Sequence, residues 1–252
     1  MMSARDDFKR RRTGGSYIVN QVAIMKPISL SIVVPVYNEE HTVEELHRRI
    51  VAAAEKVSDS FEIIFVNNRS SDQTERIARR LRPLRLIMLQ KNSGITAAID
   101  TGIAAARGET IVLLDADLQN DPAEIPLLLE KMREGYDVVI GYRTNRRDPI
   151  HRMLFSRFAN FCARRVLGLP IHDFGCGLKA YRSKFIKHFR LLGETHVFLA
   201  AVAKERGARI GEIPVSFHPR RAGASKIRIW NMVKGAFDLL SVAFFVRYFS
   251  RP

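Results

Sequence analysis

Cysteine is scarce in this chain, which contains only Cys162 and Cys176, and their separation matches no metal-ligand motif. This argues against a disulfide-stapled scaffold or a cysteine-based zinc site and favours two reduced thiols in a cytosolic protein. The sequence also lacks the Gly-x-Gly-x-x-Gly fingerprint and the P-loop, so neither device can cradle nucleotide phosphates here. No secretory signal is visible, because Asn20 and Gln21 interrupt the apolar stretch that follows the first basic residues.

Acidic residues are also few, with 26 Asp and Glu against 41 Lys and Arg, which gives a net charge of +15. Such a charge attracts polyanions, namely nucleic acid, anionic lipid or phosphorylated substrates, but does not choose among them. With 252 residues, 46% of them hydrophobic, the chain suits one large domain. Residues 1–26 are expected to form a flexible basic arm. A solvated tail is the default interpretation, and contact with anionic lipid or RNA is the alternative.

From residue 30 onward, short apolar runs alternate with segments of helical periodicity. Strands are expected at residues 30–36, 62–66, 85–89, 110–114, 137–140 and 209–217, and residues 171–182 are expected to form a glycine-containing turn that leads into a further strand. Helices are expected at residues 41–57, 72–81, 95–107, 122–134 and 149–167. This alternation predicts an α/β fold, a Rossmann-like and mostly parallel sheet flanked by helices. Ligands bind beyond the carboxyl ends of the strands in such sheets, and polar clusters follow three of the expected strands, at residues 35–39, 67–72 and 115–117.

The apolar run 110–114 ends in two carboxylates, Asp115 and Asp117. Ionised carboxylates at the end of a buried strand are costly unless something offsets their charge. A divalent cation would do so, and Mg²⁺ is usually held by one or two carboxylates together with substrate phosphates. Helix capping is the alternative, and it accounts for Asp121 before Pro122 but not for the other two carboxylates. We therefore expect a Mg²⁺ or Mn²⁺ site that binds a diphosphate.

The C-terminal segment, residues 226–252, carries an apolar stripe at helical spacing formed by Trp230, Val233, Phe237, Leu240 and Phe244. Lys234, Asp238 and Arg247 interrupt the apolar run. They argue against a membrane-spanning helix. An amphipathic helix in the plane of a bilayer is the favoured interpretation, and a helix packed on the core is the alternative.

Taken together, these segments resemble the family 2 glycosyltransferases with a GT-A fold. The similarity is greatest to the branch that makes polyprenyl-phosphate sugars, which includes dolichol-phosphate mannose synthase-like and undecaprenyl-phosphate glucosyltransferase-like enzymes. The matching segments occur in the family's order, at residues 32–40, 92–98, 115–119, 141–143, 172–181 and 218–226. The resemblance implies a GT-A domain over residues 27–225, followed by a juxtamembrane helix over 226–252.

The resemblance also implies roles for individual residues. It assigns the nucleotide pocket to Pro35, Tyr37, Glu39, Asn68 and Asp115. It assigns the Mg²⁺ or Mn²⁺ site on the donor diphosphate to Asp115, Asp117 and Gln119. It places the acceptor phosphate against Arg143, Arg220, Ser225 and Lys226, where Arg suits bidentate contacts and Lys serves as a point charge.

Catalytic roles are expected for Asp117, Arg143, Asp173 and Lys226. Asp173 is either an acceptor-site or base-like residue or simply the cap of its own turn. For Arg220 a solvated side chain is an equal alternative. His196 and His218 are candidates for active-site hydrogen bonds, although a lone histidine is more often structural.

Two departures from the family pattern bear on these expectations. Relatives usually carry Val-Asp-Asp-Gly-Ser-x-Asp after the second strand, whereas here Asn67 and Asn68 replace both carboxylates and Arg69 replaces the glycine. Asn68 keeps a carbonyl acceptor for the base but lacks the charge, which leaves base identity open. Close relatives also continue into transmembrane helices, whereas this sequence stops at Pro252.

The implied function is inverting transfer of a sugar from a UDP- or GDP-linked donor to a polyprenyl phosphate, such as dolichyl or undecaprenyl phosphate. The enzyme would lie peripherally on an anionic membrane surface at the cytoplasmic, inner face. A phosphate monoester has a second pKa near ~6, so the attacking oxygen is already ionised and needs no dedicated general base. Self-association into a homo-oligomer stays open.

Three alternatives remain. A glycan or protein hydroxyl acceptor would require a true general base. A binding-only nucleotide-sugar protein is suggested by Asn67 and Asn68. A nucleic-acid-binding module is suggested by the net charge alone, and no nucleic acid is expected as a partner, because the basic residues are dispersed and no recognition motif is present.

Overall fold

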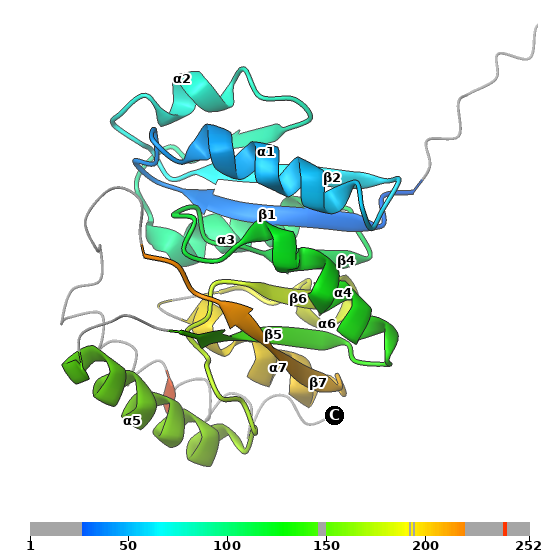
Figure 1. Cartoon of the computed structure of the whole chain (residues 1–252), viewed down its shortest axis with the longest axis vertical. Coiled ribbons are helices and arrows are strands. Elements are labelled where there is room, and N and C mark those ends of the chain that lie inside the picture. Colours follow the sequence, from blue (N-terminus) through cyan, green and yellow to red (C-terminus); the bar gives the residue numbers. More distant parts are fainter. Residues whose placement is uncertain (1–26, 146–149, 192, 194, 220–238, 241–252) are drawn as a thin grey trace, which may run out of the picture.

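The computed structural model describes residues 27–145, 150–191, 193, 195–219 and 239–240 (Figure 1). Within these residues one seven-stranded sheet has the strand order β3-β2-β1-β4-β6-β5-β7. The strands are β1 (Leu30–Val36), β2 (Phe61–Asn67), β3 (Arg85–Met88), β4 (Thr110–Leu113), β5 (Val138–Thr144), β6 (Lys179–Arg182) and β7 (Ile210–Ser216). Neighbouring strands pair in parallel except β6, which runs antiparallel to both β4 and β5. The predicted mostly parallel α/β sheet is confirmed.

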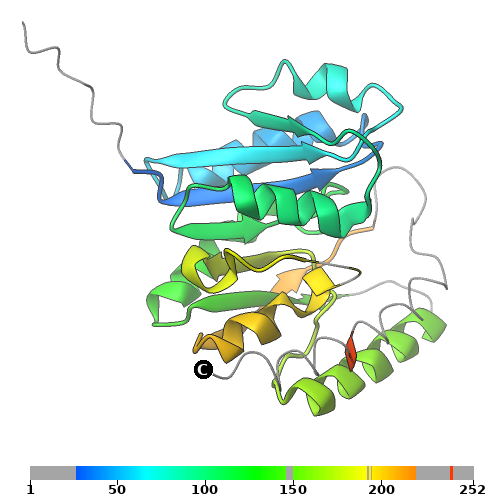
Figure 2. The same ribbon diagram turned by 180° about the vertical axis from the view of Figure 1, so that it is seen from behind.

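Helices cover both faces of this sheet (Figures 1 and 2). One face carries α1 (Val43–Ala54), α2 (Thr74–Ala78) and α4 (Ile125–Arg133), the last preceded by the 3-10 turn Pro122–Glu124. The other face carries α3 (Gly94–Ala105), α6 (Ser183–Ile186), the 3-10 turn Thr195–Phe198 and α7 (Leu199–Glu205). Each face has its own apolar core, because successive side chains of a strand point to opposite faces.

The central strand β1 shows why the sequence folds this way. Its β-branched residues suit a strand that is buried on both faces. Ile32 and Val34 pack toward α1, whereas Val33 packs toward α3. Helix α3 approaches β1 closely because Gly102 has no side chain, and a Cβ there would lie only 2.2 Å from Val33 Cγ1. Any larger residue at position 102 would push α3 away from the sheet.

A buried carboxylate joins the amino ends of β1 and β2. Glu62 Oε1 accepts hydrogen bonds from Ser31 Oγ and from the backbone N–H of Arg107, both at 2.7 Å. Its Oε2 accepts from the Arg107 guanidinium through Nε at 3.1 Å and Nη2 at 3.0 Å. Burial by itself would raise the pKa of Glu62, but these hydrogen bonds and the positive charge of Arg107 lower it below its ordinary value.

Helix α5 (Ile150–Leu167) lies apart from the two helical layers, beyond the β5–β7 side of the sheet (Figures 1 and 2). One side of it, at Cys162, Ala163 and Leu167, packs on the core that also contains Leu239. Both views place it toward the edge of the sheet where the parallel strands end. The chain therefore leaves the sheet after β5, runs along α5 and returns before β6.

Some expectations are adjusted or lie outside the described residues. The helix expected at 72–81 is shorter, Thr74–Ala78, and the helix expected at 41–57 is Val43–Ala54. The basic arm 1–26, the boundary at residue 225 and nearly all of the segment 226–252 lie outside the described residues. Among the residues that are described, no helix is both long and apolar enough to cross a bilayer. Both cysteines are free thiols, as expected.

Candidate active site

The topology explains why polar residues from distant parts of the sequence share one edge of the sheet. Strands β1, β2, β4, β5 and β7 all end at this edge, so the loops that follow them emerge there. Strand β6 runs the other way and begins at this edge, so the turn at residues 172–178 arrives there too. Three polar clusters were expected at this edge, and the family resemblance also assigned Arg143, Asp173 and His218 to the site. The topology brings all of them to the same edge.

The loops after β1 and β2 are joined by hydrogen bonds. The backbone N–H of Asn38 donates to Ser70 Oγ at 3.0 Å, and that of Ser71 donates to Asn38 Oδ1 at 2.8 Å. The backbone N–H of Glu39 donates to Thr74 Oγ1 at 2.8 Å. These contacts fix the backbone on both sides of Tyr37 and Glu39, two of the expected nucleotide-pocket residues, and both are partly exposed.

Pro35 lies within β1 without disturbing the sheet. The pairing between β1 and β4 runs from Leu30 to Val33, and the N–H of Leu114 makes the next bond, to the carbonyl of Val33. The missing N–H of Pro35 therefore costs no bond to β4, which has already ended. The position is free to carry a rigid, partly exposed ring at the edge where a nucleotide is expected.

Asn68 uses both ends of its amide to join β2 to the start of α3. Its Nδ2 donates to Asn92 Oδ1 at 2.9 Å, and its Oδ1 accepts from the backbone N–H of Ser93 at 2.9 Å. A carboxylate could accept from Ser93 but could not donate to Asn92. The amide that replaces the family's aspartate therefore donates to Asn92 Oδ1, whereas an aspartate would need the Asn92 amide to turn and donate its Nδ2.

The two carboxylates after β4 are held in different ways. Asp115 approaches the backbone so closely that a Cβ at Gly177 would lie 2.0 Å from its Oδ2, which leaves glycine as the only residue that fits. Asp117 is 8% exposed, and its Oδ1 accepts from the backbone N–H of Gln119 at 3.1 Å. Two bonds tie Gln119 to the segment after β7: the N–H of His218 donates to its carbonyl at 2.8 Å, and its Nε2 donates to the carbonyl of His218 at 3.3 Å.

This donor set fits a hard divalent cation. Among the described residues, no three His, Cys, Asp or Glu side chains are grouped as a preformed metal cluster. Mg²⁺ commonly takes only one or two protein carboxylates and completes its shell with water and substrate phosphates. Asp115, held against the bare backbone of Gly177, and Asp117 supply carboxylate oxygens of that kind at the sheet edge.

On the β5 side of the edge, an ion pair dominates. Arg143 binds Asp173 through Nε–Oδ2 at 2.6 Å and Nη2–Oδ1 at 2.8 Å, and only 14% and 8% of the two side chains are exposed. The guanidinium also lies over the ring of Phe217, 5.1 Å from its centroid. Asp173 Oδ1 in addition accepts from the N–H of Gly175 at 3.2 Å, so the residue both caps its turn and holds Arg143.

Behind this ion pair lies a buried lysine, Lys179, whose Nζ donates to the carbonyls of Phe174 at 2.8 Å and Val197 at 3.4 Å. Burial lowers its pKa, while the charges of Asp115 and Asp173 oppose that shift. The lysine thus connects the turn before β6 to the 3-10 turn before α7.

His196 as a whole residue is partly exposed, and its ring nitrogen Nδ1 bonds to a side chain of helix α3. Thr96 Oγ1 donates its only hydrogen to the carbonyl of Gly193, so Nδ1 of His196 must donate to Thr96 Oγ1, at 2.7 Å. Burial, followed by the positive charge of Lys179, lowers the pKa of His196 to about 3. The ring is therefore neutral at physiological pH, and its structural interpretation is the one that the contacts favour.

Residues with strained backbone conformations are concentrated at this edge. Among the described residues, five that are not glycine have a left-handed φ, and four of these follow strands β1, β2, β4 and β5. They are Asn38 (φ 53°), Arg69 (φ 62°), Leu118 (φ 59°) and Asn145 (φ 54°). Such conformations are costly for residues with a side chain and cluster at functional sites.

Comparison with known proteins decides the family. The family described as Glycosyl transferase family 2 matches residues 31–190, which is more than half of the chain. The chain belongs to glycosyl transferase family 2. The matched range includes β1 to β6 and hence the carboxylates after β4 and the Arg143–Asp173 pair.

Two curated relatives place this glycosyltransferase in the polyprenyl-phosphate branch that the sequence resembles. It is 40% identical over 237 residues to dodecaprenyl-phosphate galacturonate synthase of Rhizobium johnstonii, covering 90% of this chain and 70% of that protein. It is 37% identical over 221 residues to undecaprenyl-phosphate 4-deoxy-4-formamido-L-arabinose transferase of Pseudomonas paraeruginosa, covering 85% of this chain and 65% of that protein. The predicted family and branch are confirmed.

A solved structure confirms the GT-A fold. Glucosyl-3-phosphoglycerate synthase of Mycobacterium tuberculosis, crystallised with Mn²⁺, UDP and glucosyl-3-phosphoglycerate, superposes with a TM-score of 0.66. The match covers 87% of this chain and 80% of that chain at 19% sequence identity. At this identity the likeness concerns the fold alone.

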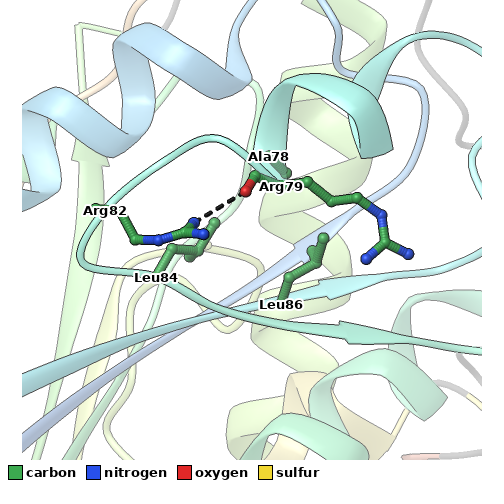
Figure 3. Close-up of a pocket in the computed structure, with 5 residues that line it drawn as sticks. All are labelled: Ala78, Arg79, Arg82, Leu84 and Leu86. Carbon is green, nitrogen blue, oxygen red and sulfur yellow. Dashed lines mark hydrogen bonds between the residues drawn. The ribbon is translucent and has the colours of Figure 1, made fainter.

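The glycosyltransferase also has a pocket that none of the candidate active-site residues lines. Figure 3 shows a pocket between α2 and β3 that is lined by Ala78, Arg79, Arg82, Leu84 and Leu86. Its dashed line marks Arg82 Nη1 donating to the carbonyl of Arg79 at 2.9 Å. None of the five residues was expected at the active site, and β3 is the outermost strand on one side of the sheet.

Three expected acceptor residues, Arg220, Ser225 and Lys226, lie outside the described residues. The segment that leads to them starts at the site, since His218 is bonded to Gln119. Sequence reasoning gave no role to three residues that shape the edge: Gly177, Lys179 and Phe217. The only available signal was the position of the first two within the family segment 172–181.

Proposed function

We propose that this glycosyltransferase transfers a sugar, with inversion, from a UDP- or GDP-linked donor to the phosphate of a polyprenyl phosphate, with Mg²⁺ or Mn²⁺ as cofactor. The observation that carries the proposal is the convergence of Asp115, Asp117 and Arg143 at one sheet edge. The names of the two curated relatives, which both act on polyprenyl phosphates, support the acceptor class.

The donor would occupy the β1–β4 side of the edge. Pro35, Tyr37 and Glu39 would line the nucleotide pocket, and Asn68 would support its wall through Asn92. Asp115, Asp117 and the Oε1 of Gln119 would hold the cation, which when bound stabilises the negative charge that develops on the leaving diphosphate. The solved structure with Mn²⁺ and UDP on the same fold supports a divalent cation as the cofactor.

The acceptor phosphate would meet the β5–β7 side. Asp173 accepts hydrogen bonds from Nε and Nη2 of Arg143, and Phe217 lies against the guanidinium. The orientation of the Arg143 side chain is therefore fixed before any ligand binds. The chain that follows His218 would bring Arg220, Ser225 and Lys226 to the same phosphate. Positive charges that are already in place lose little entropy when an anionic ligand binds.

The contacts of Asp173 favour a phosphate acceptor over a hydroxyl acceptor. Both of its oxygens bind Arg143, and one also accepts from Gly175. A general base would have to leave these partners before it could accept a proton. A phosphate monoester, with a second pKa near ~6, needs no such base at neutral pH. Asp173 therefore orients Arg143 and does not take part in proton transfer.

The location that goes with this acceptor is the surface of an anionic membrane, with the enzyme peripheral at its cytoplasmic, inner face. Lipid phosphates are presented at that surface, and a net charge of +15 is attracted to it.

A screen of donors and metals tests the function. UDP- and GDP-linked sugars are offered with undecaprenyl phosphate in the presence of Mg²⁺, Mn²⁺ or EDTA, and lipid-linked sugar is detected by mass spectrometry. We expect one donor to give product only with metal. Donor binding without product across the whole panel would favour the binding-only alternative, and transfer to a glycan or protein hydroxyl would favour the other.

A further inference from the structure

Helix α5 presents an apolar stripe to solvent. Four large side chains are more than half exposed: Ile150 at 71%, Leu154 at 58%, Phe158 at 65% and Phe161 at 52%. At about 100° per residue, the spacings of four, four and three residues place them within a sector of roughly 80° of the helix. Soluble proteins rarely leave such a contiguous row of large apolar side chains uncovered.

The same helix is basic. Arg157 and Arg165 are exposed and Arg164 is partly exposed, and all three lie within or beside the apolar sector. The sequence of α5 contains no Asp or Glu. A helix with apolar and aromatic residues on one side, flanked by arginines and free of acidic residues, has the composition of helices that lie in the interface of an anionic bilayer.

The place of α5 in the fold connects this surface to the active site. The helix lies within the chain excursion that leaves β5 and returns before β6, and the Arg143–Asp173 ion pair closes the base of that excursion. Both views in Figures 1 and 2 place α5 on the side where the parallel strands end. A bilayer against the stripe would therefore lie near the Arg143 guanidinium, which is proposed to bind the acceptor phosphate.

We propose that the stripe formed by Ile150, Leu154, Phe158 and Phe161 is the face with which this protein lies on an anionic lipid bilayer. Arg157, Arg164 and Arg165 contact the lipid headgroups. The docked helix presents the acceptor phosphate to Arg143. This inference rests on the proposed function, because a lipid-borne acceptor is what makes a bilayer the occupant of the stripe. A second copy of the chain is the competing occupant.

Vesicle binding without any donor tests the surface itself. The full chain is sedimented with vesicles of phosphatidylcholine and phosphatidylglycerol, and the double variant Phe158→Ser/Phe161→Ser is compared with wild type. We expect the variant to partition about tenfold or more weakly, since two aromatic side chains no longer enter the interface. Leu127→Ser, which alters a 49% exposed leucine on α4, is the matched control and should bind within about twofold of wild type.

The arginines are tested by reversing their charge. Arg157→Glu/Arg165→Glu should weaken binding to anionic vesicles by about tenfold or more at low salt, and by less as salt is added. Arg80→Glu, at an exposed position after α2, should leave binding nearly unchanged. Thermal unfolding of every variant shows whether the fold is kept. Equal binding by wild type and both α5 variants overturns the proposal. The proposal is also overturned if the wild-type protein is a dimer and either α5 variant is a monomer.

Two acceptors separate this inference from the proposed function. One is undecaprenyl phosphate in vesicles, and the other is a short, water-soluble isoprenyl phosphate. We expect Phe158→Ser/Phe161→Ser to lose transfer to the vesicle-borne acceptor and to keep transfer to the soluble one. If wild type binds vesicles through the stripe but glycosylates neither acceptor, docking stands and the proposed function falls. If the variant glycosylates both acceptors as wild type does, docking falls and the function stands.

Discussion

The two sides of the active-site edge are held by different forces. On the β1–β2 side, the contacts are mainly backbone amides, amide side chains and hydroxyls, as between Asn38 and Ser71 or Asn68 and Asn92. On the β5–β6 side, a nearly buried ion pair, Arg143–Asp173, lies in front of the buried Lys179. Neutral hydrogen bonds contribute about 1 kcal/mol each, whereas breaking a buried ion pair costs about 3–5 kcal/mol. The β1–β2 side, proposed to bind the nucleotide, should therefore tolerate single changes that the β5–β6 side, proposed to bind the acceptor, does not.

The largest effect is expected where the two sides meet, at Asp117. Asp117→Asn removes the charge that the proposed cation needs and should lower kcat/KM by about 10²–10³-fold. Mn²⁺ binding followed by electron paramagnetic resonance should weaken in parallel. Asp121→Asn is the matched control, because Asp121 caps the next helical turn through Ala123, where asparagine caps equally well, and its other contact is a 3.6 Å ion pair with Arg49. Equal losses in the two variants would contradict the assignment.

The next largest effect tests the ion pair. Arg143→Met leaves Asp173 charged and nearly buried, so we expect a loss of about 3 kcal/mol in the free energy of unfolding, measured by urea denaturation. Adding Asp173→Asn should recover part of that loss. Arg79→Met breaks an exposed pair with Glu75 and should cost less than about 1 kcal/mol. A loss at Arg143 no larger than at Arg79 would show that the buried ion pair contributes no more than an exposed one.

A third change examines the opposite edge of the sheet, at Glu62. Its folded-state pKa is lowered from the ordinary value of 4.5, so its stabilisation is present at neutral pH and is lost as the pH falls through the lowered pKa. We expect Glu62→Gln to cost about 1–2 kcal/mol at pH 7 and progressively less below the ordinary pKa. Urea denaturation over a pH series measures this dependence, and Glu55→Gln, at an exposed position, is the control. A cost that does not vary with pH would contradict the charge-based explanation.

The smallest effect is expected at Asn68. Asn68→Asp requires the Asn92 amide to turn its Nδ2 toward the carboxylate, which gives up the bond from the Gly94 N–H to Asn92 Oδ1, and should lower the free energy of unfolding by about 1 kcal/mol. Adding Asn92→Ser should restore part of it, because a serine hydroxyl can donate to the new carboxylate. Donor affinity, measured by calorimetry on the same variants, shows whether the amide also affects the base. A more stable Asn68→Asp variant would mean that Asn92 is not its decisive partner.

The same contrast explains what the sequence could reveal. The β1–β4 part alternates strand and helix regularly, so apolar periodicity locates its strands to within about a residue and places the clusters that follow them. The β5–β7 part inserts an antiparallel strand, β6, between two parallel ones, and periodicity carries no sign of strand direction. Asp173 was predicted as a site residue only through the family resemblance, and its partner Arg143 is 30 residues away in the chain.

Other parts of the site depend on contacts that no local pattern encodes. The need for glycine at 177 comes from Asp115, which lies on a different strand connection. The exposed face of α5 could not be recognised from periodicity, because that helix also carries an apolar side that packs on the core at Ala163. In both cases the deciding quantity is a distance or an exposed area in the folded chain.

The left-handed residues after β1, β2, β4 and β5 have a consequence for engineering donor preference. At Asn38, Arg69, Leu118 and Asn145 the main chain follows a left-handed path, and at Asn38 the side chain also bonds to Ser71. Glycine at Arg69, Leu118 or Asn145 relaxes the torsion but loosens the unfolded chain, so the two contributions nearly cancel, whereas valine or isoleucine would force the loop into another path. Saturation libraries should therefore hold these four positions constant and vary their neighbours, where new side chains can be introduced without changing the path of the loops at the active-site edge.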